Sequence, residues 1–151
     1  MAQPIKPTEI LLVEDNPDDV EMALRAFRKV RVANKVHVVR DGQEALDFLF
    51  REREYSDGAR APRPDLILLD LNLPKVSGLE VLEKIMASDK LSTIPTVVLT
   101  VSQRPEDVRK SYDLGANTYI TKPMDFAKFL YAMDILFQYW IVTATLPPKA
   151  A

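Results

Sequence analysis

Five short apolar runs, separated by longer segments of mixed polarity, limit the folds that this 151-residue chain can adopt. Each run spans four residues, most of them leucine or β-branched, which is typical of strands buried on both faces of a sheet. The predicted strands are Ile10–Val13, Val36–Val39, Leu66–Leu69, Thr96–Leu99 and Thr118–Thr121. Strands of this kind, alternating with helical segments, favour a parallel sheet covered by helices.

The segments between the runs carry apolar residues at the three- and four-residue spacing of amphipathic helices. The first of these helices has a clear start, because Asn16 can cap it and Pro17 suits its first position. The other predicted helices span residues 42–53, 79–88, 105–114 and 125–142. Five strand–helix repeats with right-handed crossovers predict a single α/β domain, a flavodoxin-like doubly wound five-stranded parallel sheet in the order 2-1-3-4-5. We expect this domain to span residues 9–143, between tails at residues 1–8 and 144–151.

Composition excludes several classes of function. The chain has no cysteine, so disulfides, thiolate metal sites and cysteine nucleophiles are ruled out. A formal net charge of -2 offers no field that would attract DNA. No apolar stretch is long enough to span a bilayer, and the first residues lack the apolar core of a signal peptide. These features favour a soluble cytoplasmic protein that binds neither DNA nor membrane.

Two of the predicted strands run directly into acidic residues. Glu14 and Asp15 follow the first strand, and Asp70 follows the third. In the order 2-1-3-4-5 these two strands are neighbours, so the three carboxylates meet at one edge, where ligands bind in such sheets. They would repel one another unless a cation joins them, and oxygen ligands suit Mg²⁺. Each acid alone could instead cap a turn or helix, but together they predict a metal site.

Two further strand ends add groups that can bind phosphate. The fourth strand leads to Thr100, whose hydroxyl can donate to a phosphoryl oxygen, and the fifth leads to Lys122, which supplies a point charge. Carboxylates, a hydroxyl and an ammonium at neighbouring strand ends therefore indicate metal-assisted phosphoryl chemistry.

With these motifs in place, the chain resembles a response-regulator receiver domain of two-component signalling, from about Glu9 to Val142. The resemblance implies that Asp70 is the phosphoacceptor. It also implies that Glu14, Asp15 and Asp70 bind Mg²⁺ together with the backbone carbonyl of Asn72.

The resemblance assigns three further features near the fourth and fifth strands. Thr100 corresponds to the switch hydroxyl, Lys122 to the phosphate-binding lysine and Tyr119 to the aromatic switch residue. The bond between Lys122 and Pro123 corresponds to a cis peptide. The chain departs from the usual pattern at Glu14, where aspartate is common, at Val101, where a small residue is usual, and in the loop at residues 74–78.

The resemblance implies that the protein accepts a phosphoryl group from the phosphohistidine of a histidine kinase. It further implies that the protein then changes its surface so that a partner can bind. It would promote its own phosphorylation and dephosphorylation without being an enzyme for a separate substrate. The long connection at residues 54–64, the phrase PDLILLDLNLPK and the aromatic C-terminal region with TLPP resemble the stand-alone regulators of bacterial phytochrome histidine kinases, well known in cyanobacteria.

Three alternatives remain open from the sequence. A receiver can serve as a scaffold without being phosphorylated. An aspartate-nucleophile phosphatase would carry its nucleophile after the first strand, whereas here Asp70 follows the third. A flavodoxin-type mononucleotide binder would need a loop of small and hydroxyl residues after the first strand, where this chain carries acids.

The last predicted helix is apolar on two faces. One stripe, assigned to the core, comprises Phe126, Phe129, Met133, Phe137 and Trp140. A second stripe comprises Tyr131, Ile135, Tyr139 and Val142. A helix that is apolar on two faces is normally buried on both, so we expect a homodimer through the fourth helix, fifth strand and fifth helix. The alternative is a few solitary surface aromatics.

Overall fold

The computed structural model describes residues 7–30 and 33–149. Within them, five parallel strands form one sheet in the order β2-β1-β3-β4-β5, which confirms the predicted topology. The strands are β1 (Thr8–Val13), β2 (Asn34–Val39), β3 (Leu66–Leu69), β4 (Thr96–Thr100) and β5 (Thr118–Thr121). β1 and β2 begin two residues earlier than predicted, because polar residues join the pairing, as in the pair Thr8 and Asn34.

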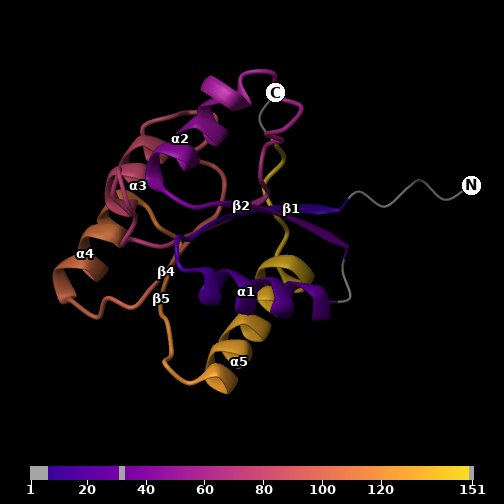
Figure 1. Cartoon of the computed structure of the whole chain (residues 1–151), viewed down its shortest axis with the longest axis vertical. Helices are drawn as coiled ribbons and strands as arrows, with labels where there is room; N and C mark the ends of the chain where they lie inside the picture. The colour runs from indigo at the N-terminus through magenta and orange to yellow at the C-terminus, as the bar shows by residue number, and fades with distance from the viewer. Residues whose placement is uncertain (1–6, 31–32, 150–151) are drawn as a thin grey trace, which may run out of the picture.

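Helices cover both faces of this sheet (Figure 1). They are α1 (Pro17–Lys29), α2 (Gly42–Phe50), α3 (Gly78–Met86), α4 (Pro105–Leu114) and α5 (Phe126–Phe137). Figure 1 shows α1 and α5 on one side of the sheet, with α2, α3 and α4 on the other. Successive strand side chains point to opposite faces, so Leu11 packs with the α2 and α3 side while Leu12 packs with α1 and α5.

Local signals at the helix ends behave as predicted. The Asn16 side-chain oxygen accepts hydrogen bonds from the amides of Asp18 (2.9 Å) and Asp19 (3.3 Å), and Pro17 is the first residue of α1. α4 ends at Leu114 and is capped by Gly115, whose φ of 116° lies in the region that favours glycine. These caps fix where the first and fourth helices begin and end.

α2 is shorter than predicted. It ends at Phe50 because Arg51 adopts a left-handed conformation with φ of 55°, and a 3-10 turn follows at Arg53–Tyr55. The side chain of Tyr55 is buried, and its hydroxyl donates a 2.8 Å hydrogen bond to Glu44 Oε2. The long connection before β3 is therefore anchored to α2 at its start.

α5 changes its helical phase near its end. Gln138–Thr143 form a π-helix, in which the Ala144 amide bonds to the Tyr139 carbonyl at 2.6 Å. This wider turn rotates the last residues relative to a regular α-helix, and Trp140 is only half-buried. Phe126, at the opposite end, is 45 % exposed, so its predicted core position is wrong, while Leu136 joins the core instead.

The second apolar stripe of the C-terminal helical region is exposed. Its members are Tyr131, Ile135, Tyr139 and Val142, each more than half accessible in the single chain, at 69 %, 52 %, 55 % and 51 %. The predicted stripe therefore lies on the surface. Across the described residues, no helix combines the length and apolar character needed to cross a membrane.

Candidate functional site

The candidate site is built by residues that continue the strands by one position. The Glu14 amide donates to the Val39 carbonyl at 3.0 Å, and the Asp70 amide donates to the Val13 carbonyl at 3.1 Å. The Lys122 amide donates to the Thr100 carbonyl at 2.7 Å. Because each backbone is held by its neighbour, the predicted residues converge at the carboxyl ends of the strands.

Three of the predicted metal ligands lie close together. Glu14, Asp15 and Asp70 each offer a carboxylate oxygen, and these oxygens all lie within 4.8 Å of one another. Asn72, the fourth predicted ligand, is adjacent, since its amide donates to Asp70 Oδ1 at 3.1 Å. An all-oxygen set of this kind fits a hard divalent cation such as Mg²⁺ or Mn²⁺.

Lys122 lies at the centre of the charged groups. Its side chain is almost fully buried, and its Nζ donates to Asp70 Oδ2 at 3.0 Å, to Asp19 Oδ2 at 2.8 Å and to Glu14 Oε1. Burial by itself lowers the pKa of Lys122, but the hydrogen bonds to Asp19 and Glu14, together with the negative charges of Asp70 and Glu14, outweigh burial and raise the pKa above its usual value. Lys122 therefore carries its charge at neutral pH.

Asp19 is a member of this group that sequence reasoning missed. Its position in the first turn of α1 indicates only a favourable interaction with the helix dipole. The available signal was that α1 starts immediately beyond β1, which places its first turn above the same strand ends. The partner on β5 could not be read from the sequence, because it lies 103 residues away.

Burial also changes the chemistry of Glu14. The residue as a whole is 2 % exposed, and burial raises the pKa of Glu14 to about 7, against the lowering effect of its hydrogen bond with Lys122. The nearby Asp70 charge raises this pKa further. In the absence of a metal, the site is thus close to taking up a proton at neutral pH.

Thr100 presents a buried hydroxyl at the same edge. Its residue is 0 % exposed, and its Oγ1 is the one buried side-chain polar atom without a hydrogen-bond partner among the described residues. A buried hydroxyl left unpaired is unfavourable. It is therefore suited to pair with a group that arrives, and a phosphoryl oxygen fits the predicted role.

Tyr119 and Val101 lie beside Thr100. Tyr119 is partly buried, and its hydroxyl donates to the Ser102 carbonyl at 2.9 Å. Val101, the bulky residue at a position where a small one is usual, is 59 % exposed.

The peptide bond between Lys122 and Pro123 is trans, so the predicted cis bond is wrong. None of the peptide bonds within residues 7–30 and 33–149 is cis. The trans form is the intrinsically preferred isomer, by about 0.5–1 kcal/mol before proline. In this form the Lys122 amide still pairs with the Thr100 carbonyl and its ammonium still reaches the acids.

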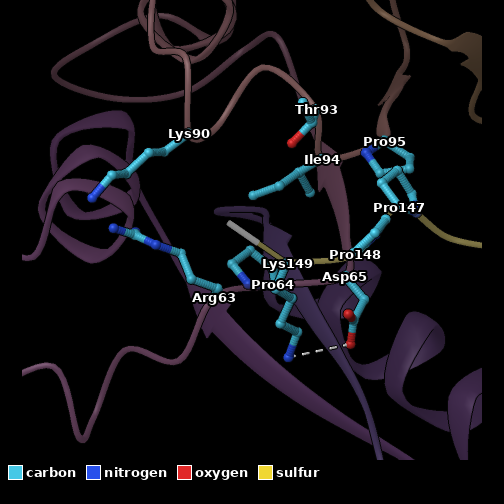
Figure 2. A pocket seen from close by; sticks show the side chains of 10 residues that line it. All are labelled: Arg63, Pro64, Asp65, Lys90, Thr93, Ile94, Pro95, Pro147, Pro148 and Lys149. Atoms are coloured by element: carbon cyan, nitrogen blue, oxygen red, sulfur yellow. Dashed lines mark ion pairs between the residues drawn. The ribbon is translucent and has the colours of Figure 1, made fainter. Parts of the chain in front are cut away.

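A separate small pocket lies at the opposite end of the strands. Figure 2 shows Pro147, Pro148 and Lys149 of the C-terminal tail beside Asp65, which precedes β3, and Pro95, which precedes β4. Lys149 Nζ lies 3.6 Å from Asp65 Oδ2. The pocket holds about 10 Å³, room for little more than a water molecule, so it is a packing feature of the tail.

Known proteins share this fold and sequence pattern. Residues 10–134 match the response regulator receiver domain family. The response regulator Rcp1 of Synechocystis sp. is 40 % identical over 141 residues, which cover 93 % of this chain and 94 % of Rcp1. The crystal structure of the phosphorylated cyanobacterial phytochrome response regulator RcpA aligns with a TM-score of 0.90 and 43 % identity, covering 95 % of this chain and all of RcpA. The Mn²⁺-bound form of Rcp1 aligns with a TM-score of 0.90 and 39 % identity, covering 94 % of this chain and all of that structure.

Proposed function

Because this chain belongs to the response regulator receiver domain family, we propose that Asp70 is its phosphoacceptor and that a sensor histidine kinase is the donor. The protein is a receiver-domain response regulator of the two-component type. The surroundings of Asp70 give the most direct support for its assignment as the phosphoacceptor. It is almost fully buried, lies within the acidic group and has the Lys122 ammonium 3.0 Å from its Oδ2.

The proposed reaction transfers one phosphoryl group. A carboxylate oxygen of Asp70 forms a bond to phosphorus as the phosphorus–nitrogen bond of phosphohistidine breaks, and the imidazole leaves with a proton taken from solvent. Water later cleaves the acyl phosphate, returning Asp70 and inorganic phosphate. The protein itself would carry the transferred phosphoryl group, on Asp70, and it would not catalyse the turnover of a separate small substrate.

The other site residues would position and stabilise the transferred group. Lys122 offers an ammonium to its oxygens, and the unpaired Thr100 hydroxyl offers a hydrogen-bond donor. Tyr119 would turn toward the space that Thr100 leaves, changing the surface near α4 and β5. We propose this movement as the switch that partners detect.

We further propose that Glu14, Asp15 and Asp70 hold Mg²⁺ with the backbone carbonyl of Asn72. Bound Mg²⁺ would offset the repulsion between carboxylates and polarise phosphoryl oxygens. The close approach of the three acids supports this site, as does the existence of a Mn²⁺-bound form of the relative Rcp1.

A phytochrome-type histidine kinase is the proposed partner. Support comes from the similarity along nearly the whole chain to RcpA, a phytochrome response regulator, at 43 % identity. We propose that this exchange takes place in the cytoplasm. Phosphotransfer profiling against the kinases of the source organism should show faster transfer from a phytochrome-type kinase than from the others. Equal rates from all kinases would contradict this pairing.

The phosphoacceptor assignment is tested with acetyl phosphate and Mg²⁺. Intact-mass measurement should show the addition of one phosphoryl group to the wild type and to Asp113→Asn, which removes an exposed carboxylate from α4. Asp70→Asn should gain none. Equal phosphorylation of Asp70→Asn would contradict the assignment, no phosphorylation of any protein would favour a scaffold receiver, and turnover of a small phosphate ester would favour a phosphatase.

We also propose that the protein forms a homodimer through the face of α4, β5 and α5. The exposed side chains of Tyr131, Ile135, Tyr139 and Val142 support it, because several large apolar side chains open to solvent on one helical region mark an interaction site.

A further inference from the structure

The three carboxylates that bind Lys122 do not have equivalent surroundings. Glu14 and Asp70 belong to the group that can hold a metal, whereas Asp19, 2.8 Å from the Lys122 ammonium, does not. The side chain of Asp19 is 18 % exposed, compared with 3 % for Glu14 and 7 % for Asp70. Asp19 is therefore the partner that a metal would leave available to Lys122.

A helix-dipole role does not account for this contact. Asp18 and Asp19 both lie in the first turn of α1, and the amides of both bond to the Asn16 side chain. Only Asp19 also forms an ion pair with Lys122, while Asp18 is exposed. A comparison of Asp18 with Asp19 therefore distinguishes a general effect of negative charge at the start of α1 from a specific effect on Lys122.

A metal and Lys122 would share two of the same carboxylates, those of Glu14 and Asp70. When a divalent cation binds Glu14 and Asp70, the ammonium loses much of its interaction with both carboxylates. Its side chain is only 5 % exposed, so water cannot replace them fully, and a buried charge without a partner is strongly unfavourable. The carboxylate of Asp19, which lies outside the group of acids that can hold the metal, would keep the buried Lys122 charge paired.

We propose that Asp19 is a positioning residue that holds the Lys122 ammonium at the rim of the site while a divalent cation occupies Glu14 and Asp70. This role rests on the metal site proposed above. The hydrogen bond to Asp19 heads the interactions that favour the charged form of Lys122, which agrees with a strong link between the two. Asp19 would thereby tighten metal binding without being a ligand.

The first test is calorimetric titration of the full chain with Mg²⁺ alone. Asp19→Asn should weaken Mg²⁺ binding about five-fold or more, the scale of an ordinary coupling between two sites. Asp18→Asn removes the same charge from the same helical turn and should change the affinity less than about two-fold. Asp19→Glu, which keeps the charge, should restore part of the loss. Circular dichroism on each variant confirms that it folds.

The second test asks whether the effect passes through Lys122. In a Lys122→Met background, which has no ammonium to hold, Asp19→Asn should lose most of its effect on Mg²⁺ affinity. An effect of the same size in both backgrounds would overturn the proposal in favour of a direct charge effect. Wild-type affinity in Asp19→Asn would overturn it as well. A wild type that binds no Mg²⁺ would overturn the metal site itself along with this inference.

Discussion

The Tyr119 hydroxyl on β5 donates a 2.9 Å hydrogen bond to the backbone carbonyl of Ser102, two residues beyond Thr100. The Tyr119 amide in turn donates to the Tyr112 hydroxyl of α4 at 3.1 Å. Tyr119 thus ties β5 both to α4 and to the loop that follows the buried Thr100 hydroxyl. A rotation of Tyr119 during signalling would have to break its bond to Ser102.

Tyr119→Phe should lower the free energy of unfolding by about 1 kcal/mol, the usual net contribution of one hydrogen bond. Urea denaturation measures the change. Tyr131→Phe makes the same chemical substitution at a side chain that is 69 % exposed, and it should change stability by less than about 0.5 kcal/mol. Equal effects of the two substitutions would show that the bond to Ser102 contributes nothing.

Thr100→Val should leave the free energy of unfolding of the unphosphorylated protein unchanged or raise it by up to about 1 kcal/mol, because it removes an unpaired buried hydroxyl. Thermal unfolding measures the change. Thr96→Val is the matched control on the same strand. Thr96 is equally buried, but its hydroxyl donates to the Ile94 carbonyl at 3.2 Å, so its loss should destabilise the protein by about 1 kcal/mol. A larger loss of stability in Thr100→Val than in Thr96→Val would contradict the finding that the Thr100 hydroxyl is unpaired.

Gly78→Ala should destabilise the protein by about 2 kcal/mol or more, as expected of overpacking against rigid atoms. An added Cβ would lie 2.2 Å from the Asp70 carbonyl oxygen and 2.5 Å from the Leu71 Cα, so the backbone at Asp70 and Leu71 would have to move. Chemical denaturation provides the measurement. Gly58→Ala is the control, because its Cβ would meet nothing closer than 3.5 Å and it bears only the strain of its φ of 72°. A smaller effect at Gly78 than at Gly58 would refute the close approach.

Glu14 should make the metal-free protein less stable as the pH rises from about 5 to about 8. The unfolded carboxyl ionises near its ordinary pKa of 4.5, whereas burial raises the folded pKa to about 7. Between these values the folded state binds more protons, so deprotonation costs stability on the order of 2 kcal/mol across this range. Unfolding in EDTA at several pH values measures it, and Glu14→Gln should lose this component of the pH dependence. A difference between wild type and Glu14→Gln that does not vary with pH would contradict the raised pKa.

Ile135→Asp should convert the proposed dimer to a monomer, because it places a charge in the middle of the exposed apolar stripe. Light scattering at micromolar concentration, before and after phosphorylation, gives the molar mass. Phe50→Asp alters another exposed apolar residue, on α2 and so on the opposite side of the sheet, and should leave the dimer intact. A wild type that is monomeric under both conditions would rule the dimer out.

The sheet and the composition of the site can both be predicted from the amino-acid sequence. Strands rich in leucine and β-branched residues can be recognised locally, and a parallel order then dictates which strand ends are neighbours. The sequence alone therefore predicts that Glu14, Asp15 and Asp70 lie together, and in the structure one oxygen of each lies within 4.8 Å of the others. Helix starts such as Asn16–Pro17 can also be predicted from the sequence, because capping depends on residues a few positions apart.

The pairing of these groups depends on how the helices and strands pack in three dimensions. Asp19 meets Lys122 across 103 positions, and Thr100 is left without a partner, because both outcomes depend on how α1 and β5 pack around the strand ends. The same is true of Phe126, whose exposure depends on where α5 begins, and of Trp140, whose partial burial depends on the π-helix that follows α5. Sequence pattern fixes which side chains reach an edge, whereas packing fixes which of them touch, since contact depends on distances that no local signal encodes.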